Sequence, residues 1–409
     1  MSNKIHTTQS FDDNDFVDFF QNFSPRYFFK LICSYYPLSE FLIIKHQKKW
    51  FHYNWIISDL CQNVNIPWTL ELIEKLDCRS FTSFFKIQDI VWQTELIQQY
   101  EDELESCIWY LSKNGKILWT EELIEKYEDN IKWGLYGLPR NRFVPWTEKL
   151  IEKYKNTFGA FWYGLSENEG DFWTEELIEK YKDKLKWYSL SENNGLPWTE
   201  ELIERYKYRW KWWRLSHVET IPWSEKLLIK YQNRLSAEDL SRNKSFPWTE
   251  ELIKKYEDDI KWGIYGLSGN EGKFWTEELI EKYKNKWRWS ELARNQALPW
   301  TEKLIEKYED RWDSSEIIGE TLWDELSKNK ALPWTKDLID KYEDRWNWEN
   351  LKNNEALPWT LELLKIYAGK SSSNKFFMPD NIGVWNNAFK PYITDQTIEK
   401  VMDSLGDIK

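Results

Sequence analysis

Apolar residues recur at helical spacing in a stretch that the chain repeats many times with small changes. In the copy FWTEELIEKYKDKLKWYSLSEN (172–193), Leu177, Ile178, Tyr181 and Leu185 share one face of a helix, and Glu and Lys residues fill the other face. Thr174 stands where a hydroxyl group caps the first turn of a helix. The pattern therefore predicts a short amphipathic helix that begins at residue 175.

The second half of the copy predicts another helix. Trp187 and Leu190 are three residues apart, which indicates a helix of roughly two turns, and Asn193 and Gly195 suit the left-handed residue that ends one. Two helices this short cannot bury their own apolar faces, so copies must stack on their neighbours.

The copies are counted on the tryptophan that precedes each helix cap, with a usual period of 25 to 27 residues. These tryptophans are Trp68, Trp92, Trp119, Trp146, Trp173, Trp198, Trp223, Trp248, Trp275, Trp300, Trp334 and Trp359. The predicted fold is all-α, an α-solenoid of about a dozen helix-turn-helix repeats with a helical cap at each end.

The expected organisation follows from where the repeat begins and ends. We predict a disordered N-terminus over 1–10, an N-terminal helical cap over 11–40 and the tandem array over 41–368 in one elongated domain. A flexible connector over 369–375 (GKSSSNK) and a C-terminal capping unit over 376–409 complete the chain. An insertion over 313–322, DSSEIIGETL, interrupts one copy as either a surface loop or an extra helical turn.

Composition adds three expectations. The chain has 29 Trp, and we expect the repeated tryptophans to lie in the core because each small copy has few core positions to fill. The net charge of −12 disfavours a general phosphate-binding role. No apolar stretch has the length of a signal peptide core or a membrane span, so we expect a cytoplasmic protein without membrane contact.

Candidate chemistry is sparse. The four cysteines (Cys33, Cys61, Cys78 and Cys107) have no CxxC spacing and the four histidines are scattered, so we expect reduced thiols and no metal site. The carboxylates occupy the first-turn and i,i+4 positions of solvated helices. We therefore expect neither an enzyme nor a bound cofactor.

One segment breaks the charge pattern. RYKYRWKWWR (205–214) interleaves basic residues with aromatic ones, as a surface that binds single-stranded nucleic acid or an acidic peptide would. Tyr206, Trp210 and Trp212 fall on expected core positions. The residues in surplus form the candidate partner-binding site: Arg205, Lys207, Tyr208, Arg209, Lys211, Trp213 and Arg214. The alternative is a solvated helix end whose cations lie near the negative pole of the helix.

The motifs PWTEELIEKY and WxxLSxN resemble the tandem tryptophan-rich short helical repeats of proteins from Bacteroidota-type bacteria and, more loosely, from giant viruses. The resemblance covers roughly 41–367 and implies no particular function. The sequence WDELS (323–327) also resembles the opening of a tetratricopeptide repeat. That likeness implies only the general idea of a superhelical groove that binds peptides.

Three functions stay open at this point. The first is a non-enzymatic scaffold that binds a protein or peptide partner on its solenoid surface. The second is a repeat protein that binds RNA or single-stranded DNA, one base per repeat, against which the net charge argues. The third is an acidic mimic of nucleic acid that inhibits a nucleic-acid-binding protein.

Overall fold

The structure is a computed structural model, and all its described secondary structure is helical. It describes residues 25–50, 65–75, 119–134, 136–156, 160–314, 321–370 and 381–404, together with the single positions 16, 17, 19, 59, 60, 63 and 112. Several expected features lie outside these residues: the disordered N-terminus, the copy from Trp92 except Ser112, three of the four cysteines, 315–320 of the insertion and most of the connector. Among the described helices, none is long and apolar enough to span a membrane.

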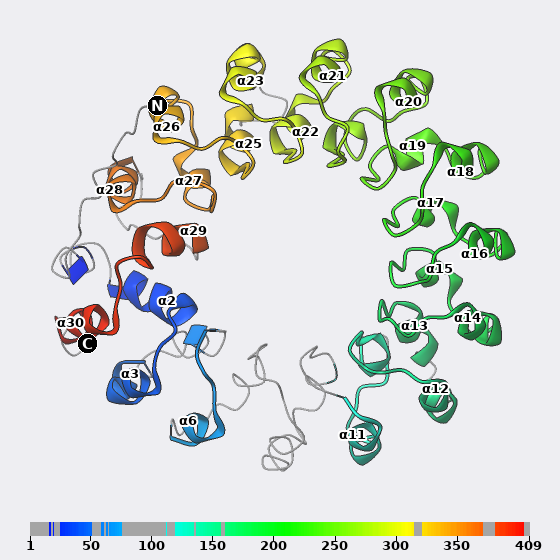
Figure 1. Ribbon diagram of the computed structural model, residues 1–409, viewed down its shortest axis with the longest axis horizontal. Helices are drawn as coiled ribbons and strands as arrows, with labels where there is room; N and C mark the ends of the chain where they lie inside the picture. The colour runs from blue at the N-terminus through cyan, green and yellow to red at the C-terminus, as the bar shows by residue number, and fades with distance from the viewer. Residues whose placement is uncertain are drawn as a thin grey trace, which may run out of the picture. The chain divides into compact units, whose positions relative to one another are not determined.

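The all-α prediction is confirmed for the described residues. They fall into two compact units: unit 1 joins 1–89 to 334–409, and unit 2 comprises 90–333. In unit 2 the helices lie in two rows along one curve (Figure 1). The convex row holds the helices that follow each Trp-Thr or Trp-Ser pair: α11 (Glu121–Lys126), α12 (Glu148–Tyr154), α14 (Glu175–Tyr181), α16 (Glu200–Arg205), α18 (Glu225–Lys230), α20 (Glu250–Lys255), α21 (Glu277–Lys282) and α23 (Glu302–Lys307).

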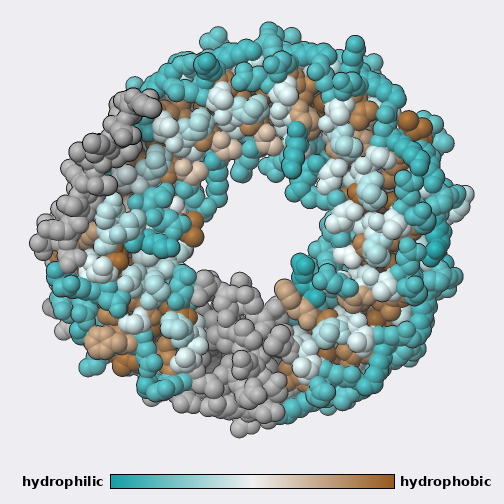
Figure 2. All heavy atoms as spheres, in the orientation of Figure 1, coloured by the Kyte–Doolittle hydropathy of each residue, from teal (hydrophilic) through white to brown (hydrophobic). Residues whose placement is uncertain are grey.

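The concave row of unit 2 holds the second helix of each copy. Its members are η1 (Leu138–Arg140), α13 (Phe161–Ser166), α15 (Trp187–Leu190), α17 (Trp212–Leu215), α19 (Ala237–Leu240), η2 (Leu267–Gly269), α22 (Trp289–Arg294) and α25 (Leu322–Lys328); α24 (Glu309–Trp312) directly follows α23. Hydrophilic residues line the convex rim, and hydrophobic residues show between the rows (Figure 2). The apolar stripes of both rows therefore meet in the space between them.

The second helix has six or seven residues, close to the two turns expected, in α13, α22 and α25, and is shorter in the other copies. In α15, α17 and α19 it has four residues, and in the two copies with paired glycines it is a single 3-10 turn, η1 or η2. The glycines explain the difference, because a Cβ atom on Gly137 would lie 1.7 Å from the Lys132 carbonyl oxygen and one on Gly266 would lie 2.1 Å from that of Lys261. Only glycine lets the chain pass so close to its own backbone.

The first helix of each described copy begins at the hydroxyl cap that the sequence predicts. In α11, α12, α14, α16, α20, α21, α23 and α26 (Lys336–Lys341) a threonine hydroxyl accepts a hydrogen bond from the backbone N–H three residues on, and Ser224 does the same for α18. The preceding tryptophans are buried in every copy from Trp119 to Trp359, as expected, whereas Trp68 is half-buried and Trp92 is not described.

The closing asparagine does something other than end a helix in the left-handed conformation. Asn193 has no positive φ, Gly195 lies outside the left-handed region as well, and the one described non-glycine residue with positive φ is Tyr265. Instead, the buried Asn193 amide donates to the carbonyl oxygens of Ser166 (3.0 Å) and Asn168 (2.9 Å) in the preceding copy. The prediction of a left-handed helix end is therefore wrong, because the side chain is needed as a bridge between copies.

The same bridge recurs along unit 2. Asn168, Asn243, Asn270, Asn295 and Asn329 each donate two hydrogen bonds to carbonyl groups of the preceding copy. A second series joins serine to backbone: the hydroxyls of Ser166, Ser191, Ser241 and Ser268 accept from the N–H twenty residues on. The serine bonds have a constant offset of 20 residues, whereas the offset of the asparagine bonds varies from 25 to 36 residues with the length of the copy.

Unit 1 contains both ends of the chain. Its helices are α2 (Pro25–Tyr35), α3 (Glu40–Lys45), α4 (Gln47–Trp50) and α6 (Leu70–Lys75) from the N-terminal part, with α26, α27 (Trp348–Leu351), α28 (Leu361–Lys370), α29 (Ile382–Val384), the π-helical turn η3 (Trp385–Phe389) and α30 (Asp395–Ser404) from the C-terminal part. Because α28 runs to Lys370, the first two residues of the expected connector are helical.

The two ends of the chain pack against each other within unit 1. Trp385 of η3 is buried and its ring lies 6.1 Å from the rings of both Tyr35 and Tyr36. Tyr36 donates to Asp395 (2.6 Å), and Lys45 forms an ion pair with Glu399 (2.6 Å). The expectation of one elongated domain with a separate cap at each end did not include this contact.

Candidate functional site

Exposed aromatic side chains occupy the same register in four successive copies of unit 2. Each lies five residues before the closing Asn, or before Val218, which takes that place in one copy. The four residues, Tyr136, Tyr163, Tyr188 and Trp213, are 47 to 53% exposed, and we call them the aromatic row. Exposed rings at a fixed repeat position form a regular surface on the concave helices.

The local sequence explains why these rings face solvent. In α15 the neighbours Ser189 and Leu190 are buried, and in α17 the neighbours Trp212 and Leu215 are buried. Only one face of a single helical turn can pack against the core. Tyr188 and Trp213 lie on the other face, away from the core. Their rings are 6.2 Å apart, edge toward face.

Basic side chains lie beside the rings. The Arg214 guanidinium is 3.7 Å from the ring centroid of Tyr188 and 5.0 Å from that of Trp213, and the Lys186 ammonium is 4.8 Å from that of Tyr163. Arg214 also forms an ion pair with Glu192. The aromatic row is therefore a ladder of rings and cations that joins neighbouring copies.

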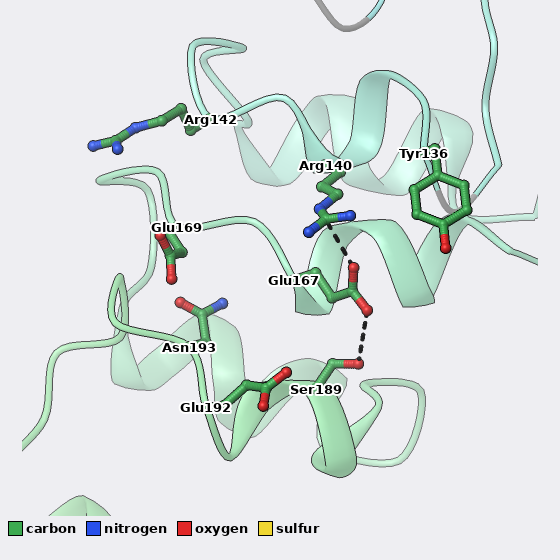
Figure 3. A pocket seen from close by; sticks show the side chains of 8 residues that line it. All are labelled: Tyr136, Arg140, Arg142, Glu167, Glu169, Ser189, Glu192 and Asn193. Carbon is green, nitrogen blue, oxygen red and sulfur yellow. Dashed lines mark hydrogen bonds and ion pairs between the residues drawn. The ribbon is translucent and has the colours of Figure 1, made fainter. Parts of the chain in front are cut away.

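A groove of about 400 Å³ opens beside Tyr136, at the start of the aromatic row. We call it the Tyr136 groove; its charged residues are Arg140, Arg142, Glu167, Glu169 and Glu192, from three successive copies (Figure 3). Arg140 pairs with Glu167 at 3.4 Å, and Glu167 accepts from the Ser189 hydroxyl at 3.4 Å. The groove thus combines one ring with groups that make paired hydrogen bonds to polar ligands.

A second groove of about 480 Å³ opens two copies beyond the end of the aromatic row. We call it the Tyr265 groove; its charged residues are Arg242, Glu271, Arg288, Glu291 and Arg294. Tyr265 occupies the register of the aromatic row, is 67% exposed and lies under the Arg242 guanidinium at 5.1 Å. Its φ of +58° is strained for a residue with a side chain.

The structure divides the candidate site predicted from the segment 205–214. Trp213 and Arg214 lie in the concave row and belong to the ladder of rings and cations. Arg205 lies on the convex helix α16 and pairs with Glu175 (3.1 Å), Lys207 pairs with Glu204, and Arg209 pairs with Asp183 (2.7 Å). Tyr208 is 79% exposed outside the aromatic row, and Lys211 is exposed at the start of α17.

Four of the five basic residues in that segment are thus engaged with carboxylates: Arg205, Lys207, Arg209 and Arg214. The segment does not form a separate basic surface, although its role in binding a partner stays a prediction. Tyr206, Trp210 and Trp212 are buried, as expected.

The exposed tyrosines Tyr136, Tyr163, Tyr188 and Tyr265 were not predicted from the sequence. Aligning the copies on the closing asparagine, rather than on the tryptophan before the helix cap, places all of them in one column with Trp213. Some copies have two additional residues between the tryptophan before the helix cap and the closing asparagine. An alignment on the tryptophan therefore does not place these aromatic residues at one position.

The described residues contain no group of three or more His, Cys, Asp or Glu side chains arranged to hold a metal ion. The chain matches no protein-family model, no curated protein and no solved structure.

Proposed function

We propose that the chain is an α-solenoid that binds an extended segment of a partner protein along the aromatic row. The repeated Asn and Ser bridges support the solenoid, because they tie a copy to the copy before it by the same two kinds of hydrogen bond. In a stack of this kind, side chains at the same position of each copy lie at regular intervals. It is a rigid scaffold for a ligand that is itself extended.

The observation that carries the binding surface is the register of the four exposed rings. Tyr and Trp bury large areas with little loss of side-chain entropy, and together with Arg they are enriched at the energetic centres of protein interfaces. Tyr163, Tyr188 and Trp213, with Arg214 between them, provide these residue types on three consecutive short helices. No requirement of the core explains them, since about half of each ring is in solvent.

The charges favour a protein ligand over a nucleic acid. A phosphate backbone needs basic groups that are free to replace its counterions. Beside the aromatic row, Arg140 and Arg214 are paired with Glu167 and Glu192, and Glu169 lines the same groove. These carboxylates would repel a phosphate chain, whereas a polypeptide can satisfy both signs of charge.

The test is a selection from a library of random displayed 12-residue peptides on the full chain. We expect the selected peptides to lose at least tenfold in affinity, about 1.4 kcal/mol, with the variant Tyr163→Ser/Tyr188→Ser/Trp213→Ser. The matched control Tyr208→Ser/Ile229→Ser removes exposed apolar side chains outside the aromatic row and should bind like the unaltered chain. Unchanged melting temperatures of both variants exclude unfolding as the cause.

Two results would contradict the proposal. One is peptide binding that the two variants reduce equally, because the aromatic row would then have no special role. The other is salt-dependent binding of a labelled random single-stranded oligonucleotide that only the triple variant loses, with no peptide selected. That result would favour the nucleic-acid alternative, in which the rings stack on bases.

A further inference from the structure

The Tyr136 groove and the Tyr265 groove share one backbone frame. Their copies contain KWGLYGLPRN (132–141) and KWGIYGLSGN (261–270), which align without a gap. The Leu138 N–H donates to the Lys132 carbonyl (2.8 Å), and the Leu267 N–H donates to the Lys261 carbonyl (2.7 Å). The two grooves therefore share the backbone turn that this hydrogen bond closes.

The charges on that common frame differ. Arg142 of the first groove corresponds to Glu271 of the second, and Glu167 corresponds to Arg294 when the closing asparagines Asn168 and Asn295 are aligned. The Tyr136 groove is lined by two Arg and three Glu residues, a net charge of −1. The Tyr265 groove is lined by three Arg and two Glu residues, a net charge of +1.

The positions of the side chains sharpen this difference in the Tyr136 groove. Arg140 is paired with Glu167, and Arg142 extends away from the other labelled side chains (Figure 3). Glu169 lies between these arginines and Asn193, is exposed, and forms no ion pair among the residues that the structure describes. Its Oε1 atom accepts from the backbone N–H and the side-chain amide of Asn194, both at 3.4 Å. A cationic ligand group would therefore pair with the Glu169 carboxylate without displacing another cation.

In the Tyr265 groove the charged group that lies over the ring and forms no ion pair with a described residue is a cation. Arg242 is exposed and lies over the Tyr265 ring at 5.1 Å, with no ion pair to a described carboxylate. The left-handed backbone at Tyr265 is disfavoured for a residue with a side chain, and strain of this kind persists mostly at binding sites. Here it holds an exposed ring beside a guanidinium that is available to an anionic group.

We infer that the two grooves select side chains of opposite charge, so that the bound segment has one direction. A basic side chain of the partner enters the Tyr136 groove, and an acidic side chain enters the Tyr265 groove. The aromatic row begins at the first groove and its register continues to the second. This inference rests on the proposed function, since it names the chemistry of the partner segment.

The experiment places 3-fluorotyrosine at position 136, 265 or 208 of the full chain and follows the ¹⁹F signal as peptides are added. The probes are hexapeptides of Gly and Ser with either two Lys or two Glu residues. We expect the Lys probe to shift the signal at 136 and the Glu probe to shift the signal at 265. Position 208 is the control, because Tyr208 is exposed outside both grooves.

Two single substitutions complete the design. Glu169→Lys should weaken binding of the Lys probe at position 136 at least fivefold without affecting binding of the Glu probe at position 265. Arg242→Glu should weaken binding of the Glu probe at position 265 at least fivefold without affecting binding of the Lys probe at position 136. Both side chains are exposed, and unchanged melting temperatures check that the loss of the hydrogen bonds from Asn194 to Glu169 leaves the fold intact.

Equal responses of both tyrosines to both probes, or no response to either, would overturn the inference. Peptides selected from the library could still require the aromatic row for binding when the grooves show no charge preference. The proposed function would then be kept, and only the inferred direction of the bound segment would be lost. Loss of row-dependent peptide binding would instead remove the proposed function itself.

Discussion

At the residue scale, the closing asparagine of each copy is the most heavily used side chain. In Asn193 the amide donates to two carbonyls of the preceding copy, the Oδ1 atom accepts from the Gly195 N–H (2.7 Å), and the backbone carbonyl accepts from the Trp198 indole (2.9 Å). A buried amide that satisfies all its groups stabilises the stack, because without it the Ser166 carbonyl and the Gly195 N–H would lose the hydrogen bonds that they make with it.

Replacing Asn193 by valine should lower the free energy of unfolding by about 2–4 kcal/mol, because the Ser166 carbonyl and the Gly195 N–H lose their partner and the Asn168 carbonyl keeps only the Trp173 indole. Val218 provides a native comparison: it occupies the asparagine position of the next copy and is fully buried. There, Thr220 donates to the Asn194 carbonyl and the Glu219 N–H to the Asn194 side chain, which replaces part of the bridge. Urea denaturation followed by tryptophan fluorescence measures the change.

The reciprocal variant Val218→Asn is the control. It places a donor near the Ser191 and Asn193 carbonyls and should leave stability unchanged or raise it by about 1 kcal/mol. If Asn193→Val were as stable as the unaltered chain, the asparagine bridges would not be what joins the copies.

At the element scale, the convex helices are tied together by a repeated cluster of Glu, Lys and Tyr. Glu152, Glu204 and Glu281 each accept hydrogen bonds from the lysine three residues on, and from the tyrosine hydroxyl of the next copy. These bonds, the lysine bond foremost, lower the pKa of each carboxyl to about 2 from its ordinary value of 4.5.

Because the folded pKa lies below the unfolded one, these groups stabilise the fold fully only above the unfolded value of 4.5, and the contribution is lost as the pH falls toward 2. The variant Glu152→Gln/Glu204→Gln/Glu281→Gln should therefore melt at a lower temperature than the unaltered chain at pH 7. The two melting temperatures should converge as the pH approaches 2.

Melting curves from pH 7 to pH 2 give the measurement. The control Glu201→Gln/Glu278→Gln/Asp258→Asn removes the same number of carboxylates from exposed positions. If the control variant had a melting temperature at pH 7 as low as that of the first variant, net charge rather than contacts between copies would set the pH dependence.

At the scale of the whole molecule, the contact between the two ends of the chain is the feature with the largest consequence. Phe16 and Phe19 lie 6.1 and 5.7 Å from the ring of Phe389, next to the contacts of Trp385 with Tyr35 and Tyr36. Unit 1 therefore needs residues from both ends of the chain to complete its core.

Trp385→Ala should destabilise unit 1 by about 3–5 kcal/mol, because a buried indole is removed. Hydrogen exchange should speed up in α2 as well as in η3, although more than 300 residues separate them in sequence. The control Trp346→Ala removes an indole that packs on Trp334 and Tyr342, and its first effect should fall on α26 and α27. Exchange that changes only in 381–404 after Trp385→Ala would contradict the packing of the two ends.

The sequence by itself determined the helices and their order. Thr caps, the Leu-Ile-Tyr stripe and the repeated tryptophans act over one or two turns, so local physics decides them and a single copy is enough to predict them. The length of the second helix was harder to predict. One turn of four residues leaves little periodic signal, and the glycine copies close as 3-10 turns because of a close backbone approach.

Only the tertiary structure decided which positions of neighbouring copies meet. The Asn bridges, the ring of Tyr188 beside that of Trp213, and the Arg242 guanidinium over Tyr265 all join side chains from different copies. Their geometry depends on how one copy is rotated against the next, which no single copy encodes. The packing of Trp385 on Tyr35 and Tyr36 is harder still to predict from the sequence, because it joins segments of unit 1 that are far apart along the chain and share no repeated motif.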